Sequence, residues 1–400
     1  MKFFVYTLGC KVNHCDSREI YSNLISYGFE ESDYLNSDII IINSCAVTSE
    51  SVRKTRQVIN KFKKINPKSF LILTGCAVIV EQFKNMPQIS LIAAKIEIVD
   101  KIIKKCKKTY PSFPHNIVKN IEKKTRIFLK IEDGCENFCS YCIIPFVRGK
   151  VQSKQLHQIE FDSKNFYELG FKEIVLVGIN LGSYGKDNGS NLTEVINVVR
   201  KYFKRIRLSS LEPDTVNKDL IEKLSYYEEI CPSFHLSLQS GSDRILKLMK
   251  RNYTILNYIE LIDDIRNRFK KATFTTDLIV GFPYETEKDF RNSLDVIDIV
   301  GFIKVNVFQF SPRPGTEALK FDQIESGIKK NRTDTAINYS KSVSKKVISS
   351  FVGENFDVLF ETKKDNFFYG YSENYIKIKH KSNENLCGQI KNVIFLPEIS

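Results

Sequence analysis

Three cysteines stand close together in the middle of the chain, at Cys135, Cys139 and Cys142. The spacing C-x3-C-x2-C is short enough to wrap a single cubane, and three thiolates this close cannot all pair with one another. The motif therefore predicts a [4Fe-4S] cluster with one iron left open for chemistry. A structural zinc site or plain buried thiols are the alternatives. Zinc would need a fourth ligand nearby, yet the next histidine is His157 and the next cysteine is Cys231.

The chain is long enough for more than one hydrophobic core. It has 400 residues, of which 42% are hydrophobic, so we expect two or three globular domains. The formal net charge of +13 favours an anionic partner, either nucleic acid or an acidic membrane surface. Lysine-rich surfaces also arise without any such partner, so charge alone leaves the question open.

Cysteine use and hydropathy indicate the compartment. Ten cysteines are too few for a disulfide scaffold in a chain of this size, and their grouping points to metal binding under reducing conditions. The apolar run 3–6 could begin a signal peptide, but polar residues follow at once. No stretch approaches the roughly 20 apolar residues that span a bilayer. We therefore expect a cytoplasmic protein that is neither secreted nor inserted into a membrane.

Residues 1–120 predict an open parallel α/β domain. Strand and helix candidates alternate there, in the order 3–6, 17–26, 39–42, 51–64 and 70–73. The strand candidates are continuous apolar runs, which are typical of parallel strands buried on both faces. The stretch 107–124 contains prolines and has no clear period, so it is interpreted as a linker to the next domain.

Each of these apolar runs is followed by a cysteine, at Cys10, Cys45 and Cys76. Parallel strands end on one edge of their sheet, where ligands of open α/β folds bind, so we expect the three thiols to converge. Three convergent thiolates predict a second cluster with an open iron. Gly9 and Gly75 would let the backbone approach such a cluster closely. The alternative is that these cysteines are ordinary core residues.

Other residues near these cysteines are weaker candidates. Asn43 and Ser44 could donate hydrogen bonds to the sulfurs of a bound cluster. Cys15 falls at the start of a helix, so it is left out of the predicted ligand set. The remaining cysteines lack any comparable grouping: Cys106, Cys231 and Cys387.

Residues 121–335 predict a partial (β/α)6 TIM-like barrel. Six apolar strand candidates are separated by helical patterns, at 127–131, 174–177, 206–208, 234–238, 274–280 and 305–308. Alternating strands and helices close in this way, and active sites lie at the carboxyl ends of the strands. Polar residues and glycines gather at those ends, and together they are expected to ring the C-x3-C-x2-C cluster.

Residues 336–400 predict a small antiparallel β-barrel. After a helical stretch at 329–350, the sequence alternates in four short segments, at 356–360, 367–371, 375–379 and 387–390. Three tyrosines stand beside three lysines there, namely Tyr369, Tyr371, Tyr375, Lys377, Lys379 and Lys381. This combination suits base stacking and phosphate contact in RNA. A purely structural barrel is the alternative.

Two further residues each have a functional and a structural interpretation. Arg148 could clamp a carboxylate or a phosphate, and a structural ion pair explains it equally well. His235 begins an apolar strand, where a histidine is more often a satisfied core residue than a ligand. The sequence has no Ser/His/Asp grouping and no Walker loop, so hydrolytic and nucleotide-driven functions have no support.

Several motifs together resemble the methylthiotransferase family of radical S-adenosylmethionine enzymes. The cysteine loop with Tyr141 before its last cysteine is similar to the superfamily motif. The family's three further cysteine motifs are similar to Leu8-Gly9-Cys10-Lys11-Val12-Asn13, Ile42-Asn43-Ser44-Cys45-Ala46-Val47-Thr48 and Thr74-Gly75-Cys76. Family-like runs also occur at 235–243, 277–283 and 310–316, so the resemblance extends from Phe3 to Glu317.

The resemblance implies two [4Fe-4S] clusters and S-adenosyl-L-methionine as cofactors. In the family, the cluster of the C-x3-C-x2-C loop cleaves S-adenosylmethionine to a 5′-deoxyadenosyl radical. The cluster of the first domain holds the sulfur, which a second S-adenosylmethionine methylates. Many relatives bind S-adenosylmethionine through a Gly-Gly-Glu fingerprint that this chain lacks. The residues taken in its place are Asn180, Glu212, Ser237 and Gln239.

The resemblance also implies a substrate. Lys11-Val12-Asn13 is similar to the branch that acts on N6-threonylcarbamoyladenosine at position 37 of tRNA, although 14–16 and 77–79 depart from the usual pattern. The C-terminal segment resembles the RNA-binding TRAM module. The alternatives are the isopentenyladenosine branch, the ribosomal-protein branch, and a non-catalytic metal-stabilised RNA-binding protein. The implied partners are the tRNA anticodon loop, an unidentified sulfur donor, and an electron donor such as flavodoxin or ferredoxin.

Overall fold

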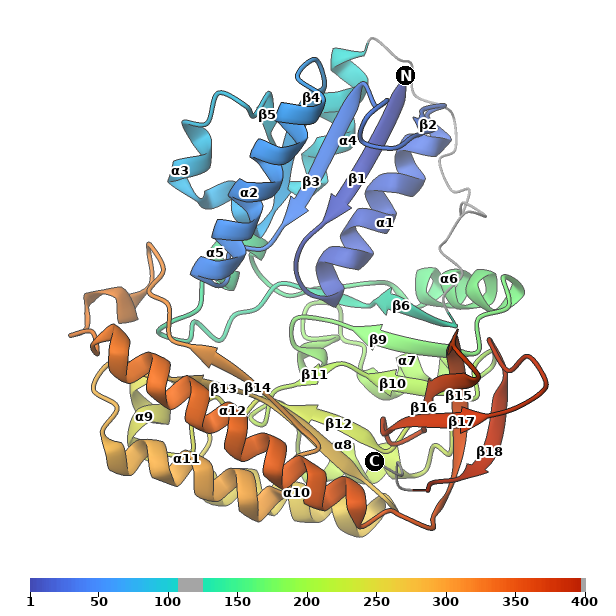
Figure 1. Ribbon diagram of the computed structural model, residues 1–400, viewed down its shortest axis with the longest axis vertical. Coiled ribbons are helices and arrows are strands. Elements are labelled where there is room, and N and C mark those ends of the chain that lie inside the picture. The colour runs from blue at the N-terminus through green and yellow to red at the C-terminus, as the bar shows by residue number, and fades with distance from the viewer. Residues whose placement is uncertain (107–124, 397–400) are drawn as a thin grey trace. The chain divides into compact units, whose positions relative to one another are not determined.

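The computed structural model describes residues 1–106 and 125–396, so the predicted linker at 107–124 lies outside the described residues. The chain divides into two compact units (Figure 1). Unit 1 comprises Met1–Ile121, Gly134–Glu136 and Cys142–Lys150; unit 2 comprises Glu122–Asp133, Asn137–Tyr141 and Val151–Ser400. The predicted boundaries near residues 120 and 335 remain predictions.

Unit 1 is built on a five-stranded parallel sheet. The strand order is β2 (Glu30–Glu31), β1 (Lys2–Thr7), β3 (Ile39–Ser44), β4 (Phe70–Gly75) and β5 (Leu91–Ile92). Its helices are α1 (Lys11–Ser26), α2 (Ser49–Ile65), α3 (Glu81–Lys84), α4 (Lys95–Lys105), α5 (Ile144–Arg148) and the 3-10 turn η1 (Cys76–Ile79). The predicted β-α-β-α-β order is confirmed, with two short edge strands added.

Side chains of the central strand alternate between two apolar layers. Ile39 and Ile41 pack in the layer that contains α1 and α4, whereas Ile40 and Ile42 pack in the layer of α2 and α3. The strand is buried on both faces, which is why it reads as an unbroken apolar run. Helix α1 begins at Lys11, six residues before the predicted 17, so its first turn directly follows Cys10.

Unit 2 contains the six predicted parallel strands. They are β6 (Arg126–Lys130), β9 (Glu173–Val177), β10 (Ile206–Leu208) with β11 (Ser210–Leu211), β12 (Ser233–Leu236), β13 (Thr273–Val280) and β14 (Lys304–Gln309). Only Ser209 separates β10 from β11, so the two sheets β6-β9-β10 and β11-β12-β13-β14 continue one strand sequence. A short antiparallel ribbon joins β7 (Glu132–Asp133) to β8 (Gln152–Ser153). The predicted α/β architecture is confirmed.

Helices connect these strands as predicted. They are α6 (Leu156–Glu168), α7 (Leu192–Val199), α8 (Lys218–Ser225), α9 (Asp243–Leu248), α10 (Ile255–Arg268), α11 (Glu287–Val300) and α12 (Ser326–Ser349), with 3-10 turns η2 (Leu181–Ser183) and η3 (Glu317–Lys320). Capping boxes begin two of them: Thr254 with Asn257 at α10, and Thr286 with Asp289 at α11. These caps satisfy backbone N–H groups of the first turn, which explains where the helices start.

The unit ends in a curled four-stranded antiparallel sheet (Figure 1). Its order is β17 (Lys377–Lys381), β16 (Phe367–Tyr371), β15 (Asn355–Lys364) and β18 (Ile390–Ile394). The predicted antiparallel class is confirmed, but two strand positions were wrong. Tyr375 has φ 69° and lies in a turn, so the third strand begins two residues later. Gly388 has φ 80°, and the fourth strand begins at Ile390.

A buried ionic cluster lies at one end of β9 and β10. The carboxylate of Glu173 has no exposed surface; its oxygens accept bonds from Arg205 Nε at 3.1 Å and Arg207 Nε at 2.8 Å. Arg126 Nε lies 3.6 Å from the same carboxylate. Burial by itself would raise the pKa of Glu173, but the three guanidinium groups outweigh it and lower the pKa to about 2.

The same arginines hold the C-terminal sheet. Arg205 donates to the carbonyl of Asp357 at 2.8 Å, and Arg207 donates to the carbonyls of Ser372 at 2.6 Å and Glu373 at 2.8 Å. Each guanidinium therefore contacts both Glu173 and the backbone of the sheet. Because the fork of arginine donors is rigid, this arrangement fixes the sheet against β9 and β10.

This cluster generates a stability prediction. Glu173→Gln should lower the free energy of unfolding by about 3–5 kcal/mol, because it leaves buried guanidinium groups without their counter-charge. The native pKa of Glu173 lies below its ordinary value, so the carboxylate contributes stability above about pH 4.5 that is lost as pH falls towards 2. Urea midpoints between pH 7 and 3, followed by circular dichroism, should therefore fall less steeply in the variant.

Glu160→Gln is the matched control. Glu160 also pairs with a cation, Lys201 at 2.8 Å, but that pair is exposed. Equal losses for the two variants at pH 7 would contradict a special role for the buried cluster.

Candidate metal centres and cofactor site

The three cysteines of unit 1 lie at the same edge of its sheet. Cys10 follows β1 and stands at the N-cap position of α1, Cys45 follows β3, and Cys76 opens η1 directly after β4. These three parallel strands are neighbours (Figure 1). The thiols are close enough for Cys10 and Cys45 to influence the pKa of Cys76. Burial raises the pKa of Cys45, and raises that of Cys76 to about 12.

Glycines allow the cysteine loops to crowd together. Gly9 has φ +132°, and an added Cβ there would lie 3.0 Å from the Cβ of Cys45. Gly75 has φ +81°, and its added Cβ would lie 2.3 Å from the side-chain oxygen of Asn43. A side chain at either position would push the loops apart, since both the backbone conformation and the space demand glycine.

Two asparagines brace these loops from inside. Asn13 Oδ1 accepts from Cys10 Sγ at 3.2 Å, and Asn13 Nδ2 donates to Asn43 Oδ1 at 3.0 Å. Asn43 Nδ2 donates to the Asn13 carbonyl at 2.9 Å and to Ser17 Oγ at 3.0 Å. The prediction that Asn43 donates to cluster sulfurs was wrong, because both of its N–H groups are used here. Ser44 pairs with Thr55, so its hydroxyl is also engaged.

The donor set fits an iron–sulfur cluster. Among the described residues, no three His, Cys, Asp or Glu side chains converge tightly enough for a single metal ion. A cubane spreads its thiolate ligands over a larger span than one ion does, and this edge offers three thiols on glycine-lined loops. Metal ligation requires thiolates, and the positive charge of bound iron would offset the cost of burying Cys76 as a thiolate.

Arg148 brings a positive charge to this edge. Its Nη2 lies 3.0 Å from Asp16 Oδ2, and it hydrogen-bonds the Cys76 thiol, where it opposes the effect of burial on the pKa. Lys95 lies 3.0 Å from the other oxygen of Asp16. Of the two interpretations offered for Arg148, the structure therefore shows the ion pair.

The C-x3-C-x2-C motif is divided between the two units. Cys135 and Cys142 belong to unit 1, and Cys139 belongs to unit 2, so each part is described by itself. In unit 1, the Cys135 amide donates to Gly149 O at 3.0 Å, and the Ile144 amide donates to Cys142 Sγ at 3.4 Å. An amide aimed at a sulfur would stabilise that sulfur as a thiolate ligand.

In unit 2, Ser140 anchors the middle of the motif. Its amide donates to Met249 O at 3.1 Å and its hydroxyl to Leu248 O at 2.7 Å, while its carbonyl accepts from the Ala318 amide at 2.8 Å. Tyr141 packs edge-on against Phe282. These contacts fix the position of Cys139 relative to the strand ends of unit 2.

A buried arginine connects Cys139 to the predicted cofactor residues. Arg251 Nη1 lies 3.4 Å from Cys139 Sγ, and the same guanidinium pairs with Glu212 and covers the ring of Tyr253 at 5.1 Å. Burial raises the pKa of Cys139, and Arg251 opposes this shift. Burial likewise raises the pKa of Glu212, again against Arg251. Sequence reasoning missed Arg251, since no motif distinguishes it from other arginines.

The four predicted cofactor residues are only partly brought together. Thr215 Oγ1 donates to Asn180 Oδ1 and to the Glu212 carbonyl, both at 2.9 Å, and Ser237 hydrogen-bonds the Glu212 side chain. Gln239 instead joins β13 through its backbone, with φ 61°. Asn180 is fully buried, and its Nδ2 has no hydrogen-bond partner among the described residues. A buried, unused donor at this position fits a bound polar cofactor.

Two of the three tyrosines predicted to stack on RNA bases are engaged within the protein. Tyr371 and Tyr375 stack on each other at 4.8 Å and lie under Arg126 and Arg207, at centroid distances of 4.9 Å and 4.8 Å. These two rings are therefore packed against the buried cluster and are not free to stack on bases. Tyr369 is a neighbour of a lysine, with Lys377 Nζ 5.3 Å from its ring centre.

His235 is a satisfied core residue, as the sequence favours. Its Nδ1 lies 2.9 Å from Thr275 Oγ1, and its Nε2 lies 3.4 Å from Asp277.

Among the described residues, no helix is long and apolar enough to cross a membrane.

Comparison with known proteins places the chain in a family. Residues 129–297 match the model of the radical SAM superfamily, and residues 2–94 match an uncharacterized protein family, UPF0004. The Threonylcarbamoyladenosine tRNA methylthiotransferase MtaB of Thermotoga maritima is 36% identical, covering 97% of this chain and 93% of that protein. The chain belongs to the radical S-adenosylmethionine methylthiotransferase family. Membership implies S-adenosylmethionine and a [4Fe-4S] cluster.

Other relatives of this methylthiotransferase support the same family. The tRNA-2-methylthio-N(6)-dimethylallyladenosine synthase of Acetivibrio thermocellus is 32% identical over 97% of the chain and 87% of that protein. Among solved structures, the radical S-adenosylmethionine methyltransferase TsrM of Kitasatospora setae aligns with a TM-score of 0.57. The alignment covers 79% of this chain and 76% of that one at 12% identity, so it supports the fold alone.

Replacing Glu212 and replacing Arg251 should destabilise the protein to different extents. Glu212→Gln should destabilise the methylthiotransferase by about 3–5 kcal/mol, because a buried guanidinium cannot lose its charge. Arg251→Met should cost less, since burial raises the pKa of Glu212 and the freed carboxyl can take up a proton. Urea denaturation of both single variants and the double variant measures the coupling.

The control for this cycle is an exposed pair on α8. Lys223 lies 2.7 Å from Asp219, and both side chains are mostly exposed. Its coupling should be small. Additive effects at Arg251 and Glu212 would contradict the pairing.

Proposed function

We propose that this protein is a tRNA methylthiotransferase that adds a methylthio group at C2 of N6-threonylcarbamoyladenosine at position 37 of tRNA. The observation that carries the proposal is a combination found in one chain. Three cysteines lie at adjacent strand ends of unit 1, a C-x3-C-x2-C loop follows, and MtaB of Thermotoga maritima matches 97% of the chain. We infer that the protein acts in the cytoplasm, because tRNA and reduced thiols occur together there.

The reaction explains why two metal centres are needed. The C2–H bond of adenosine is unactivated, so its hydrogen must be removed by a radical. Bound at Cys135, Cys139 and Cys142, a [4Fe-4S] cluster would supply the electron that cleaves S-adenosylmethionine. The second cluster is assigned to Cys10, Cys45 and Cys76, whose loops present sulfur ligands at the edge of the unit 1 sheet. An external electron donor, such as flavodoxin or ferredoxin, and a sulfur donor are also required.

Unit 2 supplies the groups proposed to hold S-adenosylmethionine. Asn180 offers a buried amide donor without a partner among the described residues, and Glu212 offers a mostly buried carboxylate. Ser237 supports Glu212, and Gln239 contributes the backbone of the next strand end. Arg251 places a positive charge between this group and Cys139, where it can orient both.

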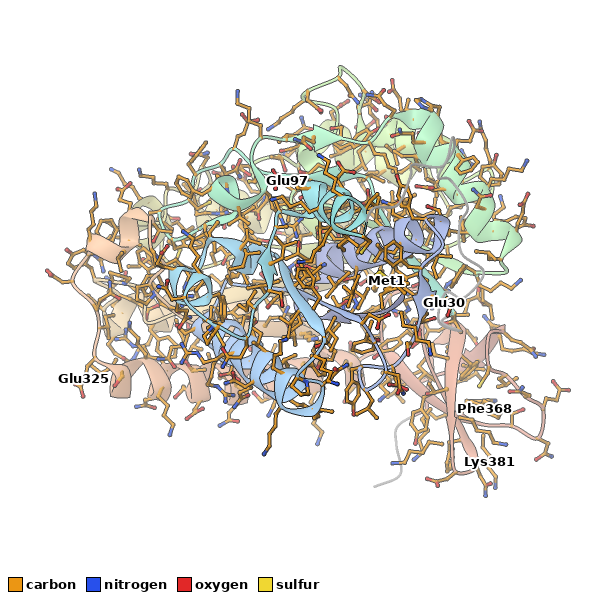
Figure 2. All side chains as sticks on the ribbon, turned by 90° about the horizontal axis from the view of Figure 1, so that it is seen from above. Met1, Glu30, Glu97, Glu325, Phe368 and Lys381 are labelled. Carbon is orange, nitrogen blue, oxygen red and sulfur yellow. The ribbon has the colours of Figure 1, made fainter. Side chains whose placement is uncertain are left out.

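The C-terminal sheet is proposed to bind tRNA phosphates. Lysines project from β15 and β17 beside aromatic rings: Lys379 lies 4.3 Å from the Phe367 ring centre, and Lys363 lies 5.3 Å from that of Phe368. Phe368 and Lys381 lie on neighbouring strands of this sheet (Figure 2). Exposed lysines of this kind, together with the net charge of +13, favour a polyanionic partner.

One alternative substrate has a specific observation behind it. The dimethylallyladenosine synthase of Acetivibrio thermocellus is 32% identical over 97% of the chain, little below the 36% of the MtaB relative. The same chemistry on N6-isopentenyladenosine is therefore the second candidate. Lys11-Val12-Asn13 favours the threonylcarbamoyladenosine branch over it.

Nucleoside mass spectrometry distinguishes these functions. We expect 2-methylthio-N6-threonylcarbamoyladenosine to appear in tRNA when the gene is expressed in a strain that lacks its own methylthiotransferases. Cys139→Ala should abolish both the product and S-adenosylmethionine cleavage, whereas Cys76→Ala should abolish the product but leave some cleavage. Cys387→Ala is the control, because this exposed cysteine lies in the C-terminal sheet region.

Two outcomes would overturn parts of the proposal. A methylthio group on isopentenyladenosine would replace the substrate but keep the reaction. Unchanged tRNA, with the protein carrying both clusters, would exclude tRNA as the substrate and direct attention to ribosomal protein.

Metal content tests the two centres separately. We expect about eight irons per chain after anaerobic reconstitution, and about four in either Cys76→Ala or Cys139→Ala, because each substitution removes one cubane. Iron and acid-labile sulfide assays measure this directly. About one zinc per chain would contradict both cluster assignments.

A further inference from the structure

Arg148 forms a buried ionic group beside the cysteines of unit 1. The side chain is only 7% exposed and that of Asp16 only 1%, and their charged atoms lie 3.0 Å apart. Lys95, which is 26% exposed, lies 3.0 Å from the second oxygen of Asp16 and 2.6 Å from Glu19. Two cations therefore share one fully buried carboxylate.

Local structure holds Arg148 in this position. It is the last residue of the five-residue helix α5, which ends where Gly149 adopts φ 75°. Ile143, just before the helix, is 3% exposed and packs in the same apolar cluster as Cys76 and Ala77. The guanidinium is thus fixed by packing on one side and by Asp16 on the other.

The guanidinium acts directly on the cysteine sulfurs. Helix α5, which ends at Arg148, packs against η1, the turn that begins at Cys76, and the guanidinium hydrogen-bonds the Cys76 thiol. A cluster held by three thiolates is anionic, and reduction adds a further negative charge to it. A cation in a buried site stabilises the more negative state by Coulomb attraction, which solvent screens only weakly there.

We propose that Arg148, held by Asp16, is a positioning residue that fixes Cys76 and raises the reduction potential of the cluster at Cys10, Cys45 and Cys76. The inference rests on the proposed function, because it assumes that these cysteines hold a cluster. According to this proposal, Arg148 and Asp16 shift the reduction potential of the cluster in opposite directions. Arg148 makes reduction of the cluster easier, and the negative charge of Asp16 makes it harder.

The residue type matters as well as its charge. A guanidinium presents several donors in a planar fork, so Arg148 can contact the Asp16 carboxylate and the Cys76 sulfur together. A lysine at this position would keep the charge but could not hold both partners in the same geometry. Arg148→Lys should therefore recover only part of the effect.

The test is a redox titration of full-length protein in a Cys139→Ala background, which leaves the unit 1 cluster as the remaining centre. The midpoint potential is followed by electron paramagnetic resonance during stepwise reduction with dithionite. We expect Arg148→Met to shift the midpoint to a more negative value and Asp16→Asn to shift it to a more positive value. Arg148→Lys should lie between Arg148→Met and the parent.

Lys101→Met is the matched control. Lys101 is a cation of the same unit that pairs with a single carboxylate, Glu97 at 2.6 Å, but both side chains are about half exposed. Its removal changes the net charge as Arg148→Met does, without changing the buried charge. The midpoint potential should stay at the parent value.

The outcomes separate this inference from the proposed function. Absence of any cluster in the Cys139→Ala parent would overturn the proposed auxiliary centre itself. A loaded cluster whose midpoint is unchanged in Arg148→Met, or shifts in the same direction in Arg148→Met and Asp16→Asn, would overturn the inference alone. Loss of iron from Arg148→Met, Arg148→Lys and Asp16→Asn alike would also overturn it, because that result indicates a purely structural role.

Discussion

Parallel strand pairing is the constraint on which both candidate centres depend. In unit 1, β1, β3 and β4 run in register, so Cys10, Cys45 and Cys76 reach one edge although they are far apart in sequence. In unit 2, the same rule brings the residues that follow β9, β11 and β12 to one end of the strands. The backbone therefore assembles each site, and side chains need only complete it.

Buried carboxylates then orient the groups that the strands bring together. Asp16 holds Arg148, Glu212 holds Arg251, and Glu173 holds Arg205 and Arg207. A buried ion pair contributes little net stability, since desolvation offsets most of the attraction. Its effect is geometric, because a guanidinium confined between two partners cannot change rotamer freely. Two of these four arginines lie directly against a predicted cluster cysteine, Arg148 at Cys76 and Arg251 at Cys139.

The sequence predicted the strands well because their signal is local. Runs such as 39–42 and 174–177 are buried on both faces. An unbroken apolar run of this length suits a buried strand and is too short for a buried helix. The cysteine positions followed from those strands. The assignments that failed depend on partners distant in the chain: Tyr371 and Tyr375 pack against Arg126, about 250 residues earlier.

Arg251 illustrates the same limit at the cofactor site. It meets Glu212 and Cys139 across separations of 39 and 112 residues, and nothing in its own sequence neighbourhood records either contact. The prediction for Asn43 failed for a related reason, because an amide donor near a cysteine can equally hydrogen-bond the backbone of the neighbouring loop. Periodicity shows which face of an element is buried, but it does not reveal which buried polar groups meet.

Two of the three residues that favour one substrate branch, Val12 and Asn13, do not form a recognition surface. Val12 is 3% exposed and Asn13 has no exposed surface, and the Asn13 side chain bonds Cys10 and Asn43. These two residues brace the loop that carries the first cysteine, so they cannot read a nucleoside directly. The lysines of the C-terminal sheet favour phosphate contact, which positions RNA without identifying a base. Lys11 is the exposed residue of this tripeptide. Direct contact with a modified adenosine must therefore come from Lys11 or from other residues near the cysteine edge, with 12–13 acting through the placement of Cys10.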